Sequence, residues 1–341
     1  MTDHADPPDK LTRRPRRVTA QDVATAAGVS RSAVSRAFTP GSYLNEAKRA
    51  RVLETAFRIG YRPNALAASL QGKPTQLVAV IVGDLRNQYD AEFMAALVSA
   101  LRRAQKWPLV LAGQDAGSER EILAVLRFPL DALIIRGGSV SPNVIQTCEK
   151  LSIPMIYTGR AVRGGKIDSI YCDNKTGMGM AVDLLIAKGR RAFGYLGGPA
   201  DWSSETERLD GVVHHLANHG LSLVAHGNAD YTFEGGAHLA AQMLRANDLD
   251  ALICANDAMA LGALSHARHA LGLAVPEALS IIGFDDVAMA QWAEFRLTTL
   301  RNPVDETVGH ILRLLDQRID NPAKTGERVR IAPILMARDT H

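Results

Sequence analysis

The 341-residue chain predicts a short all-helical N-terminal part followed by a larger α/β part built on parallel sheets. In the first 60 residues, apolar side chains recur at helical spacing. After residue 76, short apolar runs closed by Gly, Asn or Asp alternate with amphipathic stretches. That alternation indicates repeated β-α units whose sheets are covered on both faces. With 47% apolar and 22% charged residues, the composition is that of a folded globular protein.

Segment 1–17 is polar and contains prolines, so we expect a disordered basic arm there. It lacks the apolar stretch of a signal peptide, and no run in the chain approaches about 18 apolar residues. The three cysteines are odd in number and far apart, at Cys148, Cys172 and Cys254, so no disulfide framework is expected. These features predict a cytoplasmic protein that does not span a membrane.

Residues 18–62 are predicted to form a domain of three short helices. Each helix begins after a residue whose side chain is a good N-cap, namely Thr19, Ser30 and Asn45. Asp22 follows Thr19 at the spacing of a capping box, and Gly28 ends the first helix. The expected ranges are 20–27, 31–38 and 46–59.

The first two of these helices are joined by a glycine turn, which is the pattern of a helix-turn-helix. The second helix is expected to expose Arg31, Ser32, Ser35 and Arg36. An arginine there can donate two hydrogen bonds to guanine, which discriminates bases by about 1–3 kcal/mol. Thr19 and Ser30 begin helices, where hydroxyl and backbone N–H groups suit phosphates. The alternative is a three-helix bundle that binds no DNA.

Charge is unevenly distributed along the chain. The net charge is +3, but residues 1–76 hold thirteen Lys and Arg against six Asp and Glu, so this part carries +7 and the remainder −4. A basic head on a mildly acidic body favours a nucleic-acid partner, although a merely solvated basic surface has the same charge. Salt-sensitive attraction to any DNA sequence is expected from Arg13–Arg17, Lys48, Arg49 and Arg51.

Eight apolar runs predict strands, and their number predicts two sheets. The runs are residues 77–83, 108–113, 131–137, 153–159, 169–173, 193–198, 251–256 and 280–285. Helical stretches between them cover 90–106, 174–189, 204–219, 233–247 and 257–272. Since ligands bind at the carboxyl ends of parallel strands, polar residues just after each run are candidate ligand contacts.

Some strand-end residues have a structural alternative. Asp257 and Asp286 directly follow two of the runs and are predicted to cap the helices after them. Asp173, after the fifth run, either contacts a ligand or braces a loop.

Several sequence blocks together resemble one protein family. They include VTAQDVATAAGVSRSAVSRAF (18–38), RARVLETAFRIGYRPNALAASL (49–70), CANDAMALGAL (254–264) and VPEALSIIGFDD (275–286). Over about residues 18–338 the chain resembles the lactose-repressor/galactose-repressor (LacI/GalR) family of DNA-binding regulators.

This resemblance implies a homodimer whose two heads read a near-palindromic operator in double-stranded DNA. Arg31, Ser32 and Arg36 would read bases, and residues 63–76 would form a hinge helix and linker. Asn64 would contact DNA as well, and Leu70 would enter the minor groove, where an apolar wedge kinks the duplex. The alternative for Leu70 is packing on the body of the protein.

The resemblance further implies that residues 77–341 form a two-lobed, periplasmic-binding-protein-like core with a small-molecule effector between the lobes. The implied effector contacts are Tyr89, Asp90, Arg160, Asp173, Arg208, Tyr231, Asn256 and Asp285. Such side chains suit a sugar or sugar derivative, because carboxylates accept its hydroxyls and tyrosines cover an apolar face. Family members often carry two aromatic residues after the first strand, where this chain has Asn87-Gln88-Tyr89-Asp90. Asp90 either accepts a hydroxyl of the ligand or merely begins a helix. Arg136, Arg160 and Arg163 leave an acidic or phosphorylated ligand open.

Two other classes of protein fit the core less well. For an enzyme, the chain lacks a phosphate-binding loop. The adjacent acids Asp285 and Asp286 could suggest glycoside hydrolysis, but neighbouring residues in a strand point to opposite faces and so cannot flank one bond. Neither a catalytic site, a cofactor nor a metal site is predicted. For a periplasmic sugar-binding protein, the signal peptide is missing and the DNA-binding head is unexplained. The sequence therefore predicts a transcriptional repressor whose operator binding is released or promoted by an effector.

The end at 331–341 has no heptad pattern, which favours a dimer over a tetramer.

Overall fold

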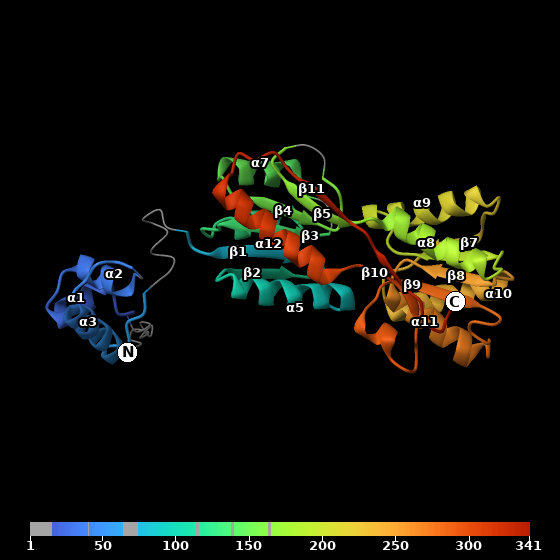
Figure 1. Ribbon diagram of the computed structural model, residues 1–341, viewed down its shortest axis with the longest axis horizontal. Helices are drawn as coiled ribbons and strands as arrows, with labels where there is room; N and C mark the ends of the chain where they lie inside the picture. Colours follow the sequence, from blue (N-terminus) through green and yellow to red (C-terminus); the bar gives the residue numbers. More distant parts are fainter. Residues whose placement is uncertain (1–15, 40, 64–73, 114–115, 138–139, 163–164) are drawn as a thin grey trace, which may run out of the picture. The chain divides into compact units, whose positions relative to one another are not determined.

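The computed structural model describes residues 16–39, 41–63, 74–113, 116–137, 140–162 and 165–341 (Figure 1). The chain divides into two compact units, Met1–Thr75 and Gln76–His341, which we call the head and the core. Most of the expected basic arm, together with Asn64, Leu70 and Arg163, lies outside the described residues. No helix in the described ranges is long and apolar enough to cross a membrane.

The head contains three helices, α1 (Ala20–Ala27), α2 (Arg31–Phe38) and α3 (Glu46–Arg58). The capping box is confirmed, because Thr19 accepts from the backbone N–H of Asp22, whose own carboxylate accepts from the Thr19 backbone. Gly28 ends α1 with φ +64°, a conformation that favours glycine. The three helices share an apolar centre that includes Val23, Val34 and Val52.

The core contains two six-stranded sheets, in agreement with the fold expected from the sequence (Figure 1). The first sheet, in spatial order, is β11 (Arg328–Ile331), β5 (Asp168–Cys172), β4 (Met155–Thr158), β3 (Ala132–Arg136), β1 (Leu77–Val82) and β2 (Trp107–Ala112). The second is β12 (Ile334–Met336), β10 (Thr298–Arg301), β9 (Ser280–Asp285), β8 (Ala251–Cys254), β6 (Phe193–Gly197) and β7 (Leu223–Asn228). Neighbouring strands are parallel except β10 and β12, which are antiparallel.

Helices cover both faces of the first sheet. Alternate residues of β1 enter two different apolar clusters, Val80 on one face and Ile81 on the other. On the Val80 face lie α5 (Gln88–Arg103) and α12 (Val304–Asp320), which also pack against each other. On the Ile81 face lie α6 (Glu119–Val125) and α7 (Pro142–Lys150). Continuous burial on both faces explains why these strands are apolar without interruption.

The second sheet is flanked by two pairs of packed helices. One pair is α8 (Asn174–Ala187) with α9 (Ser203–Asn218), and the other is α10 (Phe233–Ala246) with α11 (Asp257–Ser265). A π-helical turn over His266–Ala270 extends α11, and a short 3-10 helix covers Ala288–Gln291.

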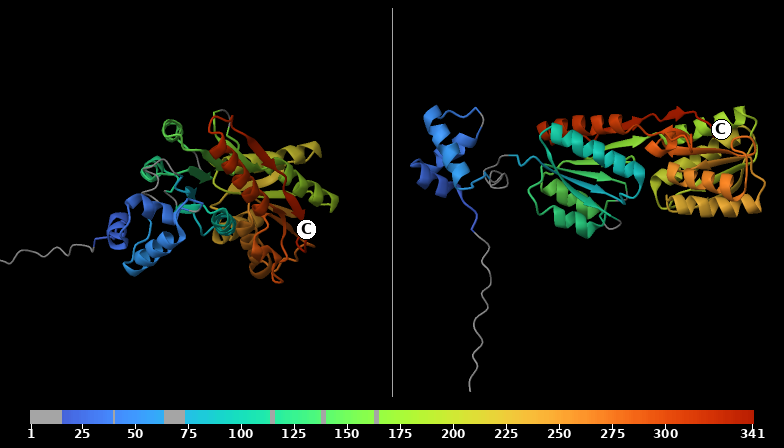
Figure 2. Two further views of the ribbon diagram at one scale, coloured as in Figure 1. Left: turned by 60° about the vertical axis from the view of Figure 1, so that its left-hand side comes forward. Right: turned by 90° about the horizontal axis from the view of Figure 1, so that it is seen from below.

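Each sheet with its helices forms a lobe, and the chain changes lobe three times (Figure 2). It leaves the first sheet after β5, returns after β10, and crosses again between β11 and β12. The two lobes of the core are therefore tied together by three segments that are far apart in the sequence.

Candidate functional site

The second helix of the head presents a polar, cationic face. Arg31, Ser32, Ser35 and Arg36 are all exposed. Ala33 and Val34 lie between them and are buried against the rest of the head. Ser30 caps α2 by accepting from the backbone N–H of Ala33. This is the arrangement in which the residues at the start of a helix are free to reach base edges.

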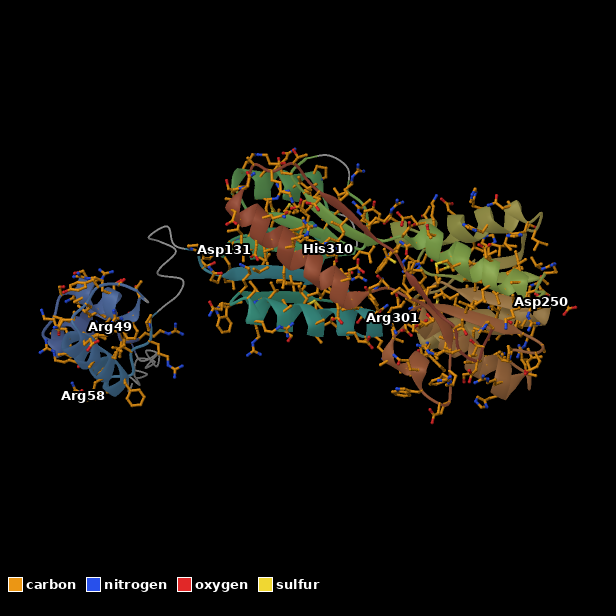
Figure 3. The ribbon with its side chains drawn as sticks, in the orientation of Figure 1. Arg49, Arg58, Asp131, Asp250, Arg301 and His310 are labelled. Atoms are coloured by element: carbon orange, nitrogen blue, oxygen red, sulfur yellow. The ribbon has the colours of Figure 1, made fainter. Side chains whose placement is uncertain are left out.

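Arg49, in the first turn of α3, holds the loop between α2 and α3 (Figure 3). Its guanidinium donates to the backbone oxygen of Ala37 at 2.8 Å and to that of Ser42 at 2.6 Å. A salt-sensitive contact to DNA was expected from Arg49, but these bonds engage both terminal nitrogens within the head. Lys48 and Arg51, beside it on the same helix, are exposed.

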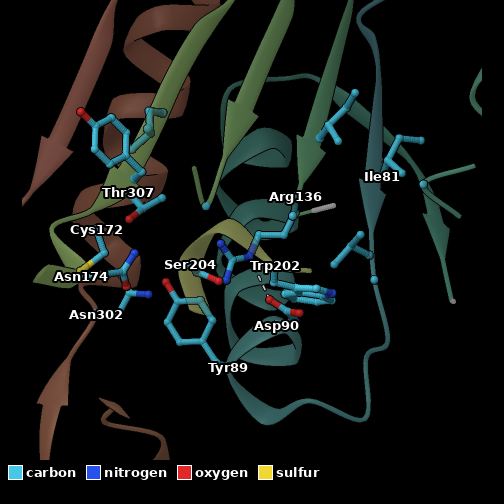
Figure 4. Close-up of a pocket in the computed structure, with 18 of the residues that line it drawn as sticks. Ile81, Tyr89, Asp90, Arg136, Cys172, Asn174, Trp202, Ser204, Asn302 and Thr307 are labelled. Atoms are coloured by element: carbon cyan, nitrogen blue, oxygen red, sulfur yellow. Dashed lines mark hydrogen bonds and ion pairs between the residues drawn. The ribbon is translucent and has the colours of Figure 1, made fainter. Parts of the chain in front are cut away.

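The core contains a cavity of about 160 Å³ that is lined from both lobes (Figure 4). Tyr89 and Asp90 in the first turn of α5 and Arg136 at the end of β3 come from the first lobe. The contribution of the second lobe is Asn174, Trp202, Ser204 and Arg208, all in α8, in α9 or at the start of α9. Asn302 and Thr307 belong to the segment that leads from β10 into α12.

Asp90 and Arg136 form an ion pair at this cavity. Arg136 Nε donates to Asp90 Oδ1 at 2.9 Å, and only 16% and 12% of the arginine and aspartate side chains are exposed. The Arg136 guanidinium also lies 4.8 Å from the ring centre of Tyr89 and 5.2 Å from that of Phe93. Aromatic faces attract a cation, so these two rings stabilise the position of the Arg136 guanidinium.

Arg208 makes a second set of contacts in the cavity wall. It donates from Nε to Asn174 Oδ1 at 2.9 Å and from Nη1 to the backbone oxygen of Ala255 at 2.5 Å. Its Nη2 lies 3.8 Å from Asp285 Oδ1, and its guanidinium is 3.9 Å from the ring centre of Phe284. Burial raises the pKa of Asp285 to about 6, in spite of the opposing effect of Arg208 and Arg136.

A buried carboxylate supports the aromatic wall of the cavity. Glu205 accepts from the hydroxyl of Tyr195 at 2.9 Å, from the backbone N–H of Gly198 at 2.7 Å and from the hydroxyl of Tyr231 at 3.4 Å. The Tyr231 ring in turn packs edge-on against Trp202, with ring centres 5.6 Å apart. Burial raises the pKa of Glu205, because the charged form is poorly solvated there.

Of the eight expected effector contacts, Tyr89, Asp90 and Arg208 line the cavity. Asp285 pairs with Arg208, and Tyr231 contacts the cavity residue Trp202.

The other three expected contacts, Asn256, Asp173 and Arg160, do not line the cavity. Asn256 caps α11 by accepting from the Met259 backbone N–H, and its amide donates to the backbone oxygen of Tyr231. Asp173 caps α8 and lies 3.5 Å from Arg330. The Arg160 guanidinium lies 5.2 Å from the ring centre of Tyr157, and its buried Nε has no hydrogen-bond partner in the described part of the chain.

The predicted capping roles of Asp257 and Asp286 are wrong. The cap of α11 is Asn256, whereas Asp257 is fully buried and accepts from the Val287 backbone and from the Thr299 hydroxyl. Asp286 accepts from Arg301 at 2.7 Å and from Arg338. Both carboxylates connect distant segments of the second lobe instead of satisfying a helix end.

Sequence reasoning left six polar or aromatic cavity residues out of the expected site, namely Tyr171, Asn174, Trp202, Ser204, Asn302 and Thr307, and it named Arg136 only as a further candidate cation. Arg136 and Asn302 end or follow strands, so the strand-end rule applies to them as well. Trp202 and Ser204 follow β6 after a longer loop, and nothing in the sequence marks them.

Comparisons with known proteins agree with this architecture. Residues 19–64 match the family model described as bacterial regulatory proteins, lacI family, and residues 182–341 match a periplasmic binding protein-like domain. The HTH-type transcriptional regulator AscG of Escherichia coli strain K12 is 33% identical over 317 residues, covering 89% of this chain and 94% of AscG. The HTH-type transcriptional regulator CelR of Thermobifida fusca is 31% identical, covering 96% of this chain and 97% of CelR.

Solved structures give the same result. A Lac repressor dimer bound to operator and the anti-inducer ONPF superimposes with a TM-score of 0.84 at 25% identity, covering 95% of this chain and 99% of the repressor chain. A complex of the transcriptional regulator CelR with cellobiose superimposes with a TM-score of 0.70 at 27% identity, covering 95% of this chain and all of CelR. The head, the two-lobed core and the match to AscG over most of both chains together show that this chain belongs to the LacI family of bacterial regulatory proteins.

Proposed function

We propose that this protein is a transcriptional repressor that binds a specific operator as a homodimer and changes its affinity for DNA when a small polyhydroxylated effector occupies the core cavity. The observation that carries this proposal is the cavity to which both lobes contribute polar and aromatic side chains, in a chain that also carries a helix-turn-helix. Binding to chromosomal DNA implies a cytoplasmic location. We propose no catalytic step for the cavity.

The exposed face of α2 supports DNA reading by the head. Arg31 and Arg36 supply the bidentate donors that recognise guanine, and Ser32 and Ser35 supply adaptable hydroxyls. Thr19 and Ser30 lie at helix N-termini, which suits contacts to phosphate. We propose that Asn64 and Leu70 complete the DNA contacts.

A homodimer follows from the size of this head. One short helix in the major groove gives limited affinity, whereas two linked heads bind two half-sites with a high effective concentration. The Lac repressor in the operator complex is likewise a dimer.

The composition of the cavity supports a small polar effector. Its volume of about 160 Å³ is below the range of roughly 300–1,000 Å³ that is usual for drug-sized ligands. Asp90, Asn174, Ser204 and Asn302 offer donors and acceptors for hydroxyl groups, and Tyr89 and Trp202 offer apolar faces. The relative CelR binds a sugar, cellobiose, in its complex.

Coupling between effector and DNA requires that the ligand prefer one arrangement of the two lobes. A ligand that touches both lobes has contacts that depend on the angle between the lobes. It therefore shifts the population towards the arrangement of the lobes that maximises those contacts. If that arrangement separates the two heads of the dimer, the effector releases DNA.

The test is selection of binding sites from random DNA with the full-length protein, followed by gel shift on the enriched sequence with and without sugars. We expect a near-palindromic sequence to be enriched, and an effector to change its affinity. Equal binding to random and enriched DNA at physiological salt would overturn the proposal.

A further inference from the structure

The cavity contains one cation whose donors are only partly used. Among the described residues, the single hydrogen bond of Arg136 runs from Nε to Asp90, so Nη1 and Nη2 have no protein acceptor. Arg208 differs, because Asn174, the Ala255 backbone and Asp285 surround its guanidinium. Arg136 is therefore the cavity arginine with donors available to a ligand.

The position of Arg136 is fixed before any ligand binds. Asp90 orients one edge of its guanidinium, and Tyr89 and Phe93 lie against the side chain. A Cβ atom added to Gly159 would lie 2.9 Å from Arg136 Nη1, which is too close. The guanidinium therefore packs directly against the backbone of Gly159, where a side chain would displace it. A guanidinium held in this way matches a carboxylate or phosphate with two parallel hydrogen bonds.

The ends of two helices add positive potential to the same cavity. The 16-residue helix α9 begins after Trp202 with no side-chain cap, and both Trp202 and Ser204 line the cavity. The 17-residue helix α12 also begins without a side-chain cap, between the cavity residues Asn302 and Thr307. Uncapped N–H groups and the helix dipole favour a negative charge nearby, and the first-turn carboxylates Glu205 of α9 and Asp305 and Glu306 of α12 meet part of that preference.

From these observations we infer that the effector is an anion, a monosaccharide-sized polyol with one carboxylate or phosphate group bound by Arg136. The inference rests on the proposed function and names the chemical class of its effector. Asp90 keeps free acceptor sites beside the arginine, and these receive hydroxyl groups of the same ligand. A neutral sugar leaves Nη1 and Nη2 with uncharged acceptors, whose hydrogen bonds are about half as strong as those to an anion.

The test uses the full-length protein and matched ligand pairs at constant ionic strength. The pairs are D-glucuronate with D-glucose and D-galacturonate with D-galactose, and D-glucose 6-phosphate forms a separate phosphate arm. Acetate and inorganic phosphate probe the anion site without a sugar ring. Binding is measured by calorimetry and by the shift in thermal unfolding.

We expect the charged member of at least one pair, or the phosphate arm, to bind at least tenfold more tightly than its neutral partner. Arg136→Gln should reduce that affinity at least tenfold and weaken the neutral partner much less, so that the preference for the anion is lost. Arg136→Lys keeps the positive charge but loses the planar pair of N–H donors, so it should retain a smaller preference for the anion. Arg120→Gln is the matched control, because Arg120 lies on α6 with 92% of its side chain exposed.

Neutral sugars that bind as tightly as their acids, or an anion preference that survives in Arg136→Gln, would overturn the inference and leave the proposed function intact. Absence of binding by every compound would overturn the inference together with the effector part of the proposed function. Operator selection is a separate readout, and thermal unfolding without ligand shows whether the core of each Arg136 variant is folded.

Discussion

Arg136 and Asp90 lie 46 positions apart in the chain, yet Nε of the arginine is 2.9 Å from Oδ1 of the aspartate. The arginine ends β3, and the aspartate lies in the first turn of α5. Because both side chains are largely buried at the cavity, removing either one would leave an unpaired buried charge in the surface that a ligand meets.

Removing the carboxylate from this pair should destabilise the protein. Asp90→Ala leaves Arg136 as a buried charge without its partner, which costs about 3 kcal/mol. Asp90→Asn keeps an acceptor for Nε and should cost clearly less. Urea unfolding of the ligand-free core measures both changes. Equal losses below about 0.5 kcal/mol would mean that solvent already screens the pair.

Arg31→Ala and Arg36→Ala should each relax specificity at one position of the operator. The loss of a bidentate contact to guanine corresponds to about 1–3 kcal/mol of discrimination, while binding to random DNA changes little. Competition gel shifts against single-base operator variants measure this. A uniform loss across all bases at every position would assign these arginines to the DNA backbone instead.

Lys48 and Arg49 are adjacent on α3 but should behave differently. Lys48→Ala removes an exposed charge, so it should weaken binding to all sequences and reduce the salt slope by about one unit. Arg49→Ala removes one hydrogen bond to Ala37 at the end of α2 and one to Ser42 in the α2–α3 loop, so it should speed hydrogen exchange of the loop amides even without DNA. Unchanged exchange in Arg49→Ala would return that residue to the role of a phosphate contact.

Asp285 should make stability depend on pH. Its pKa is raised to about 6 in the folded protein, mainly by burial, whereas an aspartate in the unfolded chain titrates near 3.9. Between about pH 4 and 6 the folded state therefore binds more protons, so stability falls as pH rises through this window and then levels off. The contribution is about 2–3 kcal/mol.

Asp285→Asn is the variant that isolates this effect, because Glu205 and Asp257 also have raised pKa values. Relative to the unmodified protein, the variant should gain stability as pH rises from 4 to 6. Urea unfolding at several pH values gives the difference directly. Parallel curves for the two proteins would show that Asp285 is not the titrating group.

Much of the fold follows from local sequence, and the exceptions have physical reasons. The apolar, continuously buried strands such as β1 and β9 were predicted, whereas β7, β10, β11 and β12 were not. β7 lies at the edge of its sheet with every second residue exposed, so its run is broken by polar residues. β10 carries buried threonines, whose hydroxyls bond to other segments of the second lobe.

The site was predicted only in part, because strand-end position does not determine which way a side chain points. Asn256 and Asp173 follow strands as expected, but their side chains satisfy the first turns of helices. Asp285 and Asp286 have φ values of +114° and +57°, so the strand alternation used for them ends there. The pairing of Asp90 with Arg136 depends on how α5 packs on the first sheet, which local sequence does not contain.

The three crossings between the lobes also restrict how the core deforms. Two lobes joined by one segment can both swing and twist, and three tethers restrict those motions more strongly. We therefore expect ligand binding to act mainly on the angle between the lobes. Substitutions at the crossings, far from both ligand and DNA, should therefore alter how strongly one site responds to the other without altering what either site recognises.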